Sequence, residues 1–136
     1  MTIKDYMEQN PNQIPTGFVS PEGKFYYASF LEHCAMADEI CEWYGYKTGG
    51  YGYNSPGKDP LTTLEDKGWI HITVSSFFEH GINILFTAFA FTEEQKNCLR
   101  PLIENPPIPF TKSSIHTLKY EFPDIDFGGY LAQPGA

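Results

Sequence analysis

Histidine and cysteine are the side chains of this chain most able to bind a metal ion, and three of them lie close together. His33, Cys34 and Cys41 fall within one segment that is predicted to be helical. His33 and Cys41 would be more than two helical turns apart, too far to share a small ion. Cys34 and Cys41 would share a helix face, as residues of a buried stripe do. The sequence therefore predicts no metal site and no cofactor.

Nucleophilic or acid–base chemistry also finds little support. A cysteine nucleophile needs a base beside it and an environment that lowers its pKa. Cys98 lies in the middle of a predicted helix, and Cys34 adjoins His33, but adjacent side chains on a helix diverge. His71 and His80 could converge as acid and base, but two surface histidines around a hairpin are the default explanation. We predict no catalytic residue and expect a protein that is not an enzyme.

A loop rich in tyrosine and glycine, GYKTGGYGYNSPGK at residues 45–58, is the longest predicted loop. It lacks the GxxxxGK[ST] pattern of a phosphate-binding loop. It is either a flexible surface loop or a contact loop whose tyrosines offer rigid amphipathic area to a partner. We place the predicted contact surface on this loop and on nearby acidic residues. The predicted partner-binding residues are Tyr44, Tyr46, Tyr51, Tyr53, Asp38, Glu39, Glu42, Asp59, Glu65 and Asp66.

The charge balance points to the class of partner. The chain carries 17 acidic and 9 basic side chains, a formal net charge of -8. Direct nucleic-acid binding needs clustered lysine and arginine, so a basic protein is the favoured partner. No apolar run reaches the length of a membrane span, and residues 1–10 lack the features of a secretion signal. Three cysteines without paired spacing indicate reduced thiols. We expect a cytoplasmic protein with no membrane partner.

The elements that must position these residues form one α+β domain over residues 1–136, a small antiparallel sheet packed against two or three helices. Capping and stop signals predict helices at 2–10, 29–44, 60–67 and 92–104, the second opened by a capping box from Ser29 to Glu32. Apolar patterns predict strands at 18–19, 25–27, 69–75 and 82–89. Residues 112–122 fit a helix or a strand, with a slight preference for helix. Residues 123–136 are expected to be a loosely ordered tail.

The strand at 69–75 shows alternation typical of a single buried face. Its apolar residues point to the core, which places His71 on the opposite, polar face. The predicted core residues are Ile70, Ile72, Val74, Ile84, Phe86, Leu99 and Leu102.

Three segments resemble a group of small accessory proteins carried by phages and mobile elements of Gram-positive bacteria. They are FVSPEGKFYYASFLEHCAMA (18–37), PLTTLEDKGWIHI (60–72) and FTEEQKNCLRPLI (91–103), which are similar to that group's SPDG, GWI and TEEQ pattern. The loop at 45–58 has no place in the pattern. The resemblance implies an anti-CRISPR-like inhibitor of a basic host nucleic-acid-processing protein, such as a CRISPR effector nuclease. The alternative is a small-molecule or nucleotide binder, or an enzyme, using the loop with His71 or His80.

Overall fold

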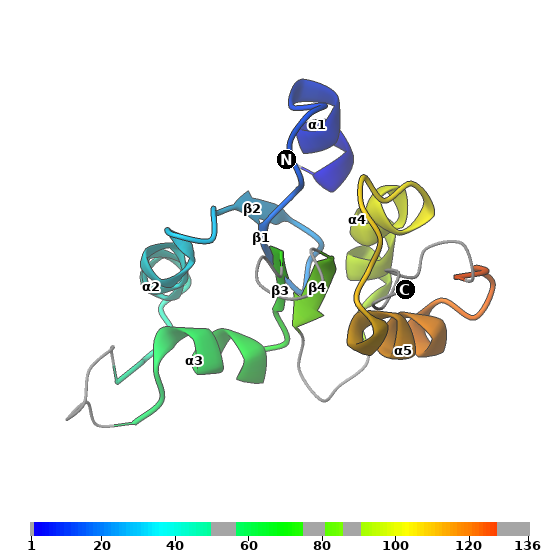
Figure 1. Ribbon diagram of the computed structural model, residues 1–136. Helices are drawn as coiled ribbons and strands as arrows, with labels where there is room; N and C mark the ends of the chain where they lie inside the picture. Colours follow the sequence, from blue (N-terminus) through cyan, green and yellow to red (C-terminus); the bar gives the residue numbers. More distant parts are fainter. Residues whose placement is uncertain (1, 50–56, 75–80, 86–90, 128–136) are drawn as a thin grey trace.

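Four short strands form an antiparallel sheet at the centre of the molecule (Figure 1). The computed structural model describes residues 2–49, 57–74, 81–85 and 91–127. Within them the strands run in the order β2-β1-β3-β4. Their bounds are β1 (Gly17–Val19), β2 (Phe25–Tyr27), β3 (Ile70–Val74) and β4 (Ile82–Leu85). The helices are α1 (Ile3–Gln9), α2 (His33–Trp43), α3 (Pro60–Asp66), α4 (Glu93–Glu104) and α5 (Lys112–Glu121). The α+β class and the single domain are as predicted.

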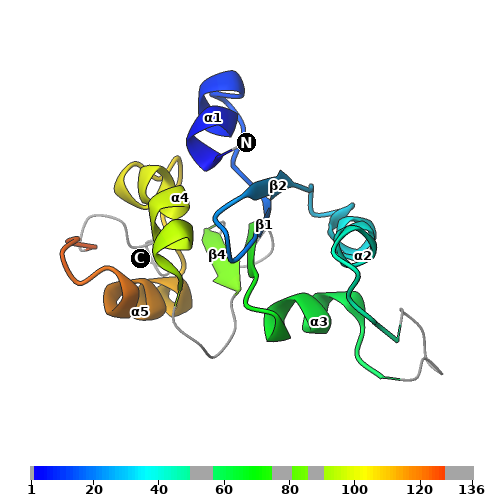
Figure 2. The ribbon, with the colours of Figure 1, turned by 180° about the vertical axis from the view of Figure 1, so that it is seen from behind.

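Helices lie on both sides of this sheet. Figures 1 and 2, which view the molecule from opposite directions, show α2 and α3 on one side and α4 and α5 on the other. Each side has its own cluster of buried side chains. The larger cluster joins α1, α4 and α5 to the sheet, and the smaller cluster joins α2 and α3 to it.

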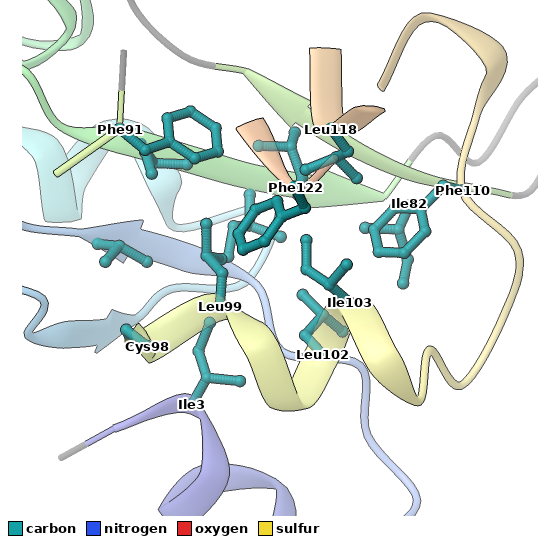
Figure 3. Packing of buried hydrophobic residues seen from close by; sticks show 14 of the residues in the cluster. Ile3, Ile82, Phe91, Cys98, Leu99, Leu102, Ile103, Phe110, Leu118 and Phe122 are labelled. Carbon is teal, nitrogen blue, oxygen red and sulfur yellow. The ribbon is translucent and has the colours of Figure 1, made fainter. Parts of the chain in front are cut away.

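The larger cluster confirms most of the predicted core. Leu99, Leu102 and Ile103 of α4 point toward the side chains of α5, and all three are fully buried (Figure 3). Ile70, Ile72 and Ile84 of the sheet are buried in the same cluster. Val74 is only half-buried, and Phe86 lies outside the described residues.

The second covered face of the sheet explains where the strand prediction was wrong. Phe18 pairs with His71 and Val19 pairs with Ile70, so these neighbours alternate between the two faces. Val19 and Ile70 enter the larger cluster, while Phe18 enters the smaller one. His71 was expected on a solvent-facing side, but its face is covered as well and only 7% of the residue is exposed.

Helix starts follow the capping signals in all but one case. Thr2 and Thr92 each close a capping box, and Asp59 caps α3 through the backbone amide of Thr62. The predicted box at Ser29 is wrong. There the amide of Glu32 donates to the carbonyl of Ser29, 3.0 Å away, and forms a separate turn, so that α2 begins only at His33.

The later start of α2 leaves Phe30 outside the helix. A helix beginning at residue 29 would have included Phe30, which instead is 55% exposed. The buried residues of α2 are Ala37, Ile40 and Cys41.

The ambiguous C-terminal segment is a helix. Thr111 caps α5, and Ile115 and Leu118 are buried in the larger cluster, which agrees with the preference for helix over strand. Of the tail predicted to be loosely ordered, the described part reaches Phe127, which is buried in that same cluster. The three cysteines are free thiols, as predicted.

Candidate functional site

The solvent-facing side of α2 carries three carboxylates. Asp38, Glu39 and Glu42 are all exposed, on the opposite side of the helix from its buried stripe. The sequence of α2 contains no lysine or arginine. Within the described residues, none of the three carboxylates has an ion-pair partner. Their negative charge is therefore available to a partner.

A large aromatic side chain adjoins these carboxylates. Trp43, the last residue of α2, is 58% exposed, and its ring lies 5.9 Å from the Tyr26 ring at a tilted angle. Sequence reasoning did not select Trp43, although it lies four positions from Glu39, a spacing that puts two residues on neighbouring turns of one helix face. We call Asp38, Glu39, Glu42 and Trp43 the acidic α2 face.

Two of the predicted contact tyrosines pack into the fold. The Tyr44 and Tyr26 hydroxyls are 2.8 Å apart, and the Tyr44 ring meets the Trp69 ring edge-to-face at 5.1 Å. Burial raises the pKa of Tyr44 to about 12, with the hydroxyl of Tyr26 adding to the effect. The Tyr46 hydroxyl accepts a hydrogen bond from the Trp69 indole, 3.3 Å away. The other two predicted tyrosines, Tyr51 and Tyr53, lie outside the described residues.

The remaining predicted carboxylates are spread around α3. Asp59 is occupied as the helix cap, 2.7 Å from the Thr62 amide. Asp66 forms an ion pair with Lys58. Glu65 lines a hollow between α3, β4 and α5. Partial burial raises the pKa of Glu65, and the nearby Asp59 and Asp66 add to this effect. These three residues therefore do not extend the acidic α2 face as one continuous surface.

A pocket of about 460 Å³ opens between α3 and the two described ends of the tyrosine- and glycine-rich loop. The Gly49 amide donates to the Lys58 carbonyl, 2.6 Å away, and so joins those ends. The lining residues are Lys47, Thr48, Gly49, Gly57, Lys58, Thr63, Asp66 and Lys67. Lys47 and Lys58 lie near the two ends of the loop in the sequence, but sequence reasoning did not foresee that they converge with Lys67.

A compact group of imidazole and thiol side chains lies between α2 and β3. The Cys34 thiol is 3.5 Å from Nε2 of His33, whereas adjacent helical side chains were expected to diverge. His33 is the first residue of α2, and its Nδ1 contacts the carbonyl of Phe30 in the preceding turn. The His33 ring also stacks on the His71 ring at 5.3 Å. The helix start, with its irregular turn, thus brings together neighbours that a regular helix separates.

His71 is held neutral in this group. Burial, together with a smaller effect of the neighbouring His33, lowers its pKa to about 4. It stacks on Phe18 with 4.5 Å between ring centroids, so it does not face solvent as an acid or base would. Its proposed partner, His80, lies outside the described residues. Among the residues described, histidine, cysteine and carboxylate side chains form no group of three or more able to hold a metal ion.

Comparisons with protein families, curated proteins and solved structures return no match to this chain. Within the described part of the chain, no helix has the length and apolar character needed to cross a membrane.

Proposed function

We propose that this protein is a non-enzymatic binding protein whose acidic α2 face docks on a basic protein. One observation carries the proposal: an exposed tryptophan adjoins three carboxylates that have no ion-pair partner among the described residues. Tryptophan is among the residues that contribute most to binding energy at protein interfaces. Carboxylates around it attract a positively charged surface and accelerate association.

The proposed partner is a nucleic-acid-processing protein of a bacterial host, such as a CRISPR effector nuclease. This part of the proposal follows from the resemblance to phage and mobile-element proteins described above. Such a partner carries basic surfaces that bind phosphates. In this proposal, a row of carboxylates on a helix competes with nucleic acid for those surfaces. The protein thereby inhibits its partner without catalysis.

The test compares two variants with matched controls, using a guide-loaded CRISPR effector nuclease as the partner. Trp43→Ala should weaken binding by about tenfold or more, as expected for a hot-spot residue. The control Tyr120→Ala removes an aromatic residue that is 81% exposed on α5 and should leave affinity unchanged. Biolayer interferometry measures both, and DNA cleavage assays report inhibition.

Charge is tested separately from the aromatic contact. The triple variant D38N/E39Q/E42Q should mainly slow association and reduce its dependence on salt. The control E8Q/E22Q/E94Q removes the same charge from exposed positions on other elements. Equal rates in the two triple variants, or unchanged affinity in Trp43→Ala, would remove this face from consideration.

Small-molecule binding is a second candidate function, and the pocket beside α3 favours it. The form of this alternative that relied on His71 is disfavoured, because His71 is buried under α2 and does not line the pocket. The chemistry of the pocket itself suggests a specific class of ligand.

A further inference from the structure

Three lysines converge on the pocket beside α3, although the protein as a whole is strongly acidic. Lys47 and Lys58 come from the two ends of the tyrosine- and glycine-rich loop, and Lys67 follows α3. They are a third of the 9 basic side chains in a chain of formal net charge -8. We call this pocket, with the eight described lining residues named above, the lysine pocket.

The lysine pocket has a positive balance. Three lysines and one aspartate line it, which leaves a net formal charge of two positive charges. Asp66 pairs with Lys58, so Lys47 and Lys67 supply the surplus charge. Three lysines gathered at one hollow repel one another more strongly than lysines scattered over the surface would. Their grouping therefore indicates a binding role for the pocket.

Several contacts hold the wall of the lysine pocket in place. Lys67 lies over the Tyr46 ring, 5.4 Å from its centroid, and the Tyr46 hydroxyl accepts a hydrogen bond from the buried Trp69. The Thr63 hydroxyl donates to the carbonyl of Asp59, 2.8 Å away. The α3 side of the site is therefore pre-formed, which lowers the entropic cost of binding a ligand.

We propose that the lysine pocket binds a small phosphorylated molecule. Its volume of about 460 Å³ falls within the range of small-molecule sites. Ammonium groups bind phosphate as point charges, and three of them line the pocket. The opposing Asp66 carboxylate competes with the ligand for Lys58, so this residue limits the affinity.

This proposal predicts opposite effects for two kinds of variant. Inorganic pyrophosphate is the probe, and isothermal titration calorimetry measures its Kd. K47Q/K67Q should weaken pyrophosphate binding by about tenfold or more, since each of the two substitutions removes a direct charge interaction with the probe. D66N should tighten binding several-fold, because it removes a carboxylate and releases Lys58.

Matched controls separate local charge from total charge. K112Q/K119Q removes two exposed lysines from α5, and E8Q removes an exposed carboxylate from α1. Neither control should change the Kd by more than about twofold, because none of these residues lines the pocket and exposed charges are screened by salt. Circular dichroism confirms that each variant keeps its fold.

ATP as a second probe distinguishes a nucleotide from a free polyphosphate. Tighter binding of ATP than of pyrophosphate assigns the site to nucleotides, and equal binding assigns it to the phosphate groups alone. The proposal is overturned if wild-type protein binds neither probe with a Kd below about 1 mM. It is also overturned if K47Q/K67Q and K112Q/K119Q behave alike. Trp43→Ala should leave pyrophosphate binding unchanged, so this test does not depend on the acidic α2 face.

Discussion

At the scale of single residues, the surroundings of His71 shift its pKa strongly. His71 stacks on Phe18 and on His33, and its pKa is lowered to about 4. The folded protein therefore keeps His71 neutral at a pH where the unfolded chain protonates it. This difference makes the stability of the fold depend on pH.

The sign of that dependence follows from proton uptake. Well above a pH of about 6.5, His71 is neutral in both the folded and the unfolded state and does not affect the free energy of unfolding. As the pH falls toward 4, the unfolded chain gains a proton that the folded chain does not, so the free energy of unfolding decreases. The loss attributable to His71 should be about 2 kcal/mol between about pH 7 and about pH 5, and about 3 kcal/mol once its titration is complete.

Urea denaturation of the wild type and of His71→Phe measures this effect. The wild type should lose about 2 kcal/mol more than His71→Phe over the same pH range, whatever the stability of the variant at neutral pH. His116 is exposed on α5, and His116→Gln serves as the control that should follow the wild type. Parallel pH profiles for wild type and His71→Phe would contradict a buried, neutral His71.

At the scale of elements, Thr92 connects the β1–β2 hairpin to α4. Its hydroxyl accepts from the Gln95 amide at 3.0 Å and donates to the Pro21 carbonyl at 2.7 Å. Pro21 lies in the turn of that hairpin, 71 positions earlier in the chain. One side chain thus fixes both the start of a helix and the position of that helix against the sheet.

Thr92→Ala should lower the free energy of unfolding by about 2 kcal/mol, since it removes the cap and leaves the Pro21 carbonyl without this donor. Thr2 closes the equivalent capping box at α1, but its hydrogen bonds are exposed. Thr2→Ala is therefore the matched control, with an expected loss of about 1 kcal/mol or less. Chemical denaturation compares the two, and equal losses would show that the contact with the hairpin contributes nothing.

At the scale of the whole molecule, one sheet joins two separate hydrophobic clusters. Neighbouring residues of the same strand serve different clusters, as Phe18 and Val19 do in β1. Loss of either cluster therefore exposes one face of strands that the other cluster needs. We expect the two sides of the sheet to unfold together.

Leu99→Ala tests this coupling from the α4 side. Leu99 is fully buried in the larger cluster, so the substitution should cost about 2 to 5 kcal/mol. Both tryptophans, Trp43 and Trp69, lie on the side of the smaller cluster, and their fluorescence should shift to the same lower denaturant midpoint as the circular dichroism signal. A fluorescence transition that stays at the wild-type midpoint would show independent unfolding. Leu31→Ala, at a residue that is 92% exposed, is the control and should change stability by less than about 0.5 kcal/mol.

Local physical chemistry made much of this fold readable from the sequence. The side chains of Thr2, Asp59 and Thr92 each accept a hydrogen bond from the backbone amide three positions later, so short patterns are enough to locate these caps. The alternation of Ile70 and Ile72 likewise follows from the geometry of a single strand. The charge balance and the acidic residues of α2 were equally visible.

Contacts between distant segments decided the rest. His71 is buried because α2 covers the second face of the sheet. The sequence of β3 itself does not indicate that a helix packs on this face. Tyr44 packs against the smaller cluster through Tyr26 and Trp69, which are far from it in the sequence. Lys47, Lys58 and Lys67 face one pocket because the two described ends of the loop are joined beside α3. Local sequence therefore determined the elements, whereas their packing decided which side chains are buried and which meet in the lysine pocket.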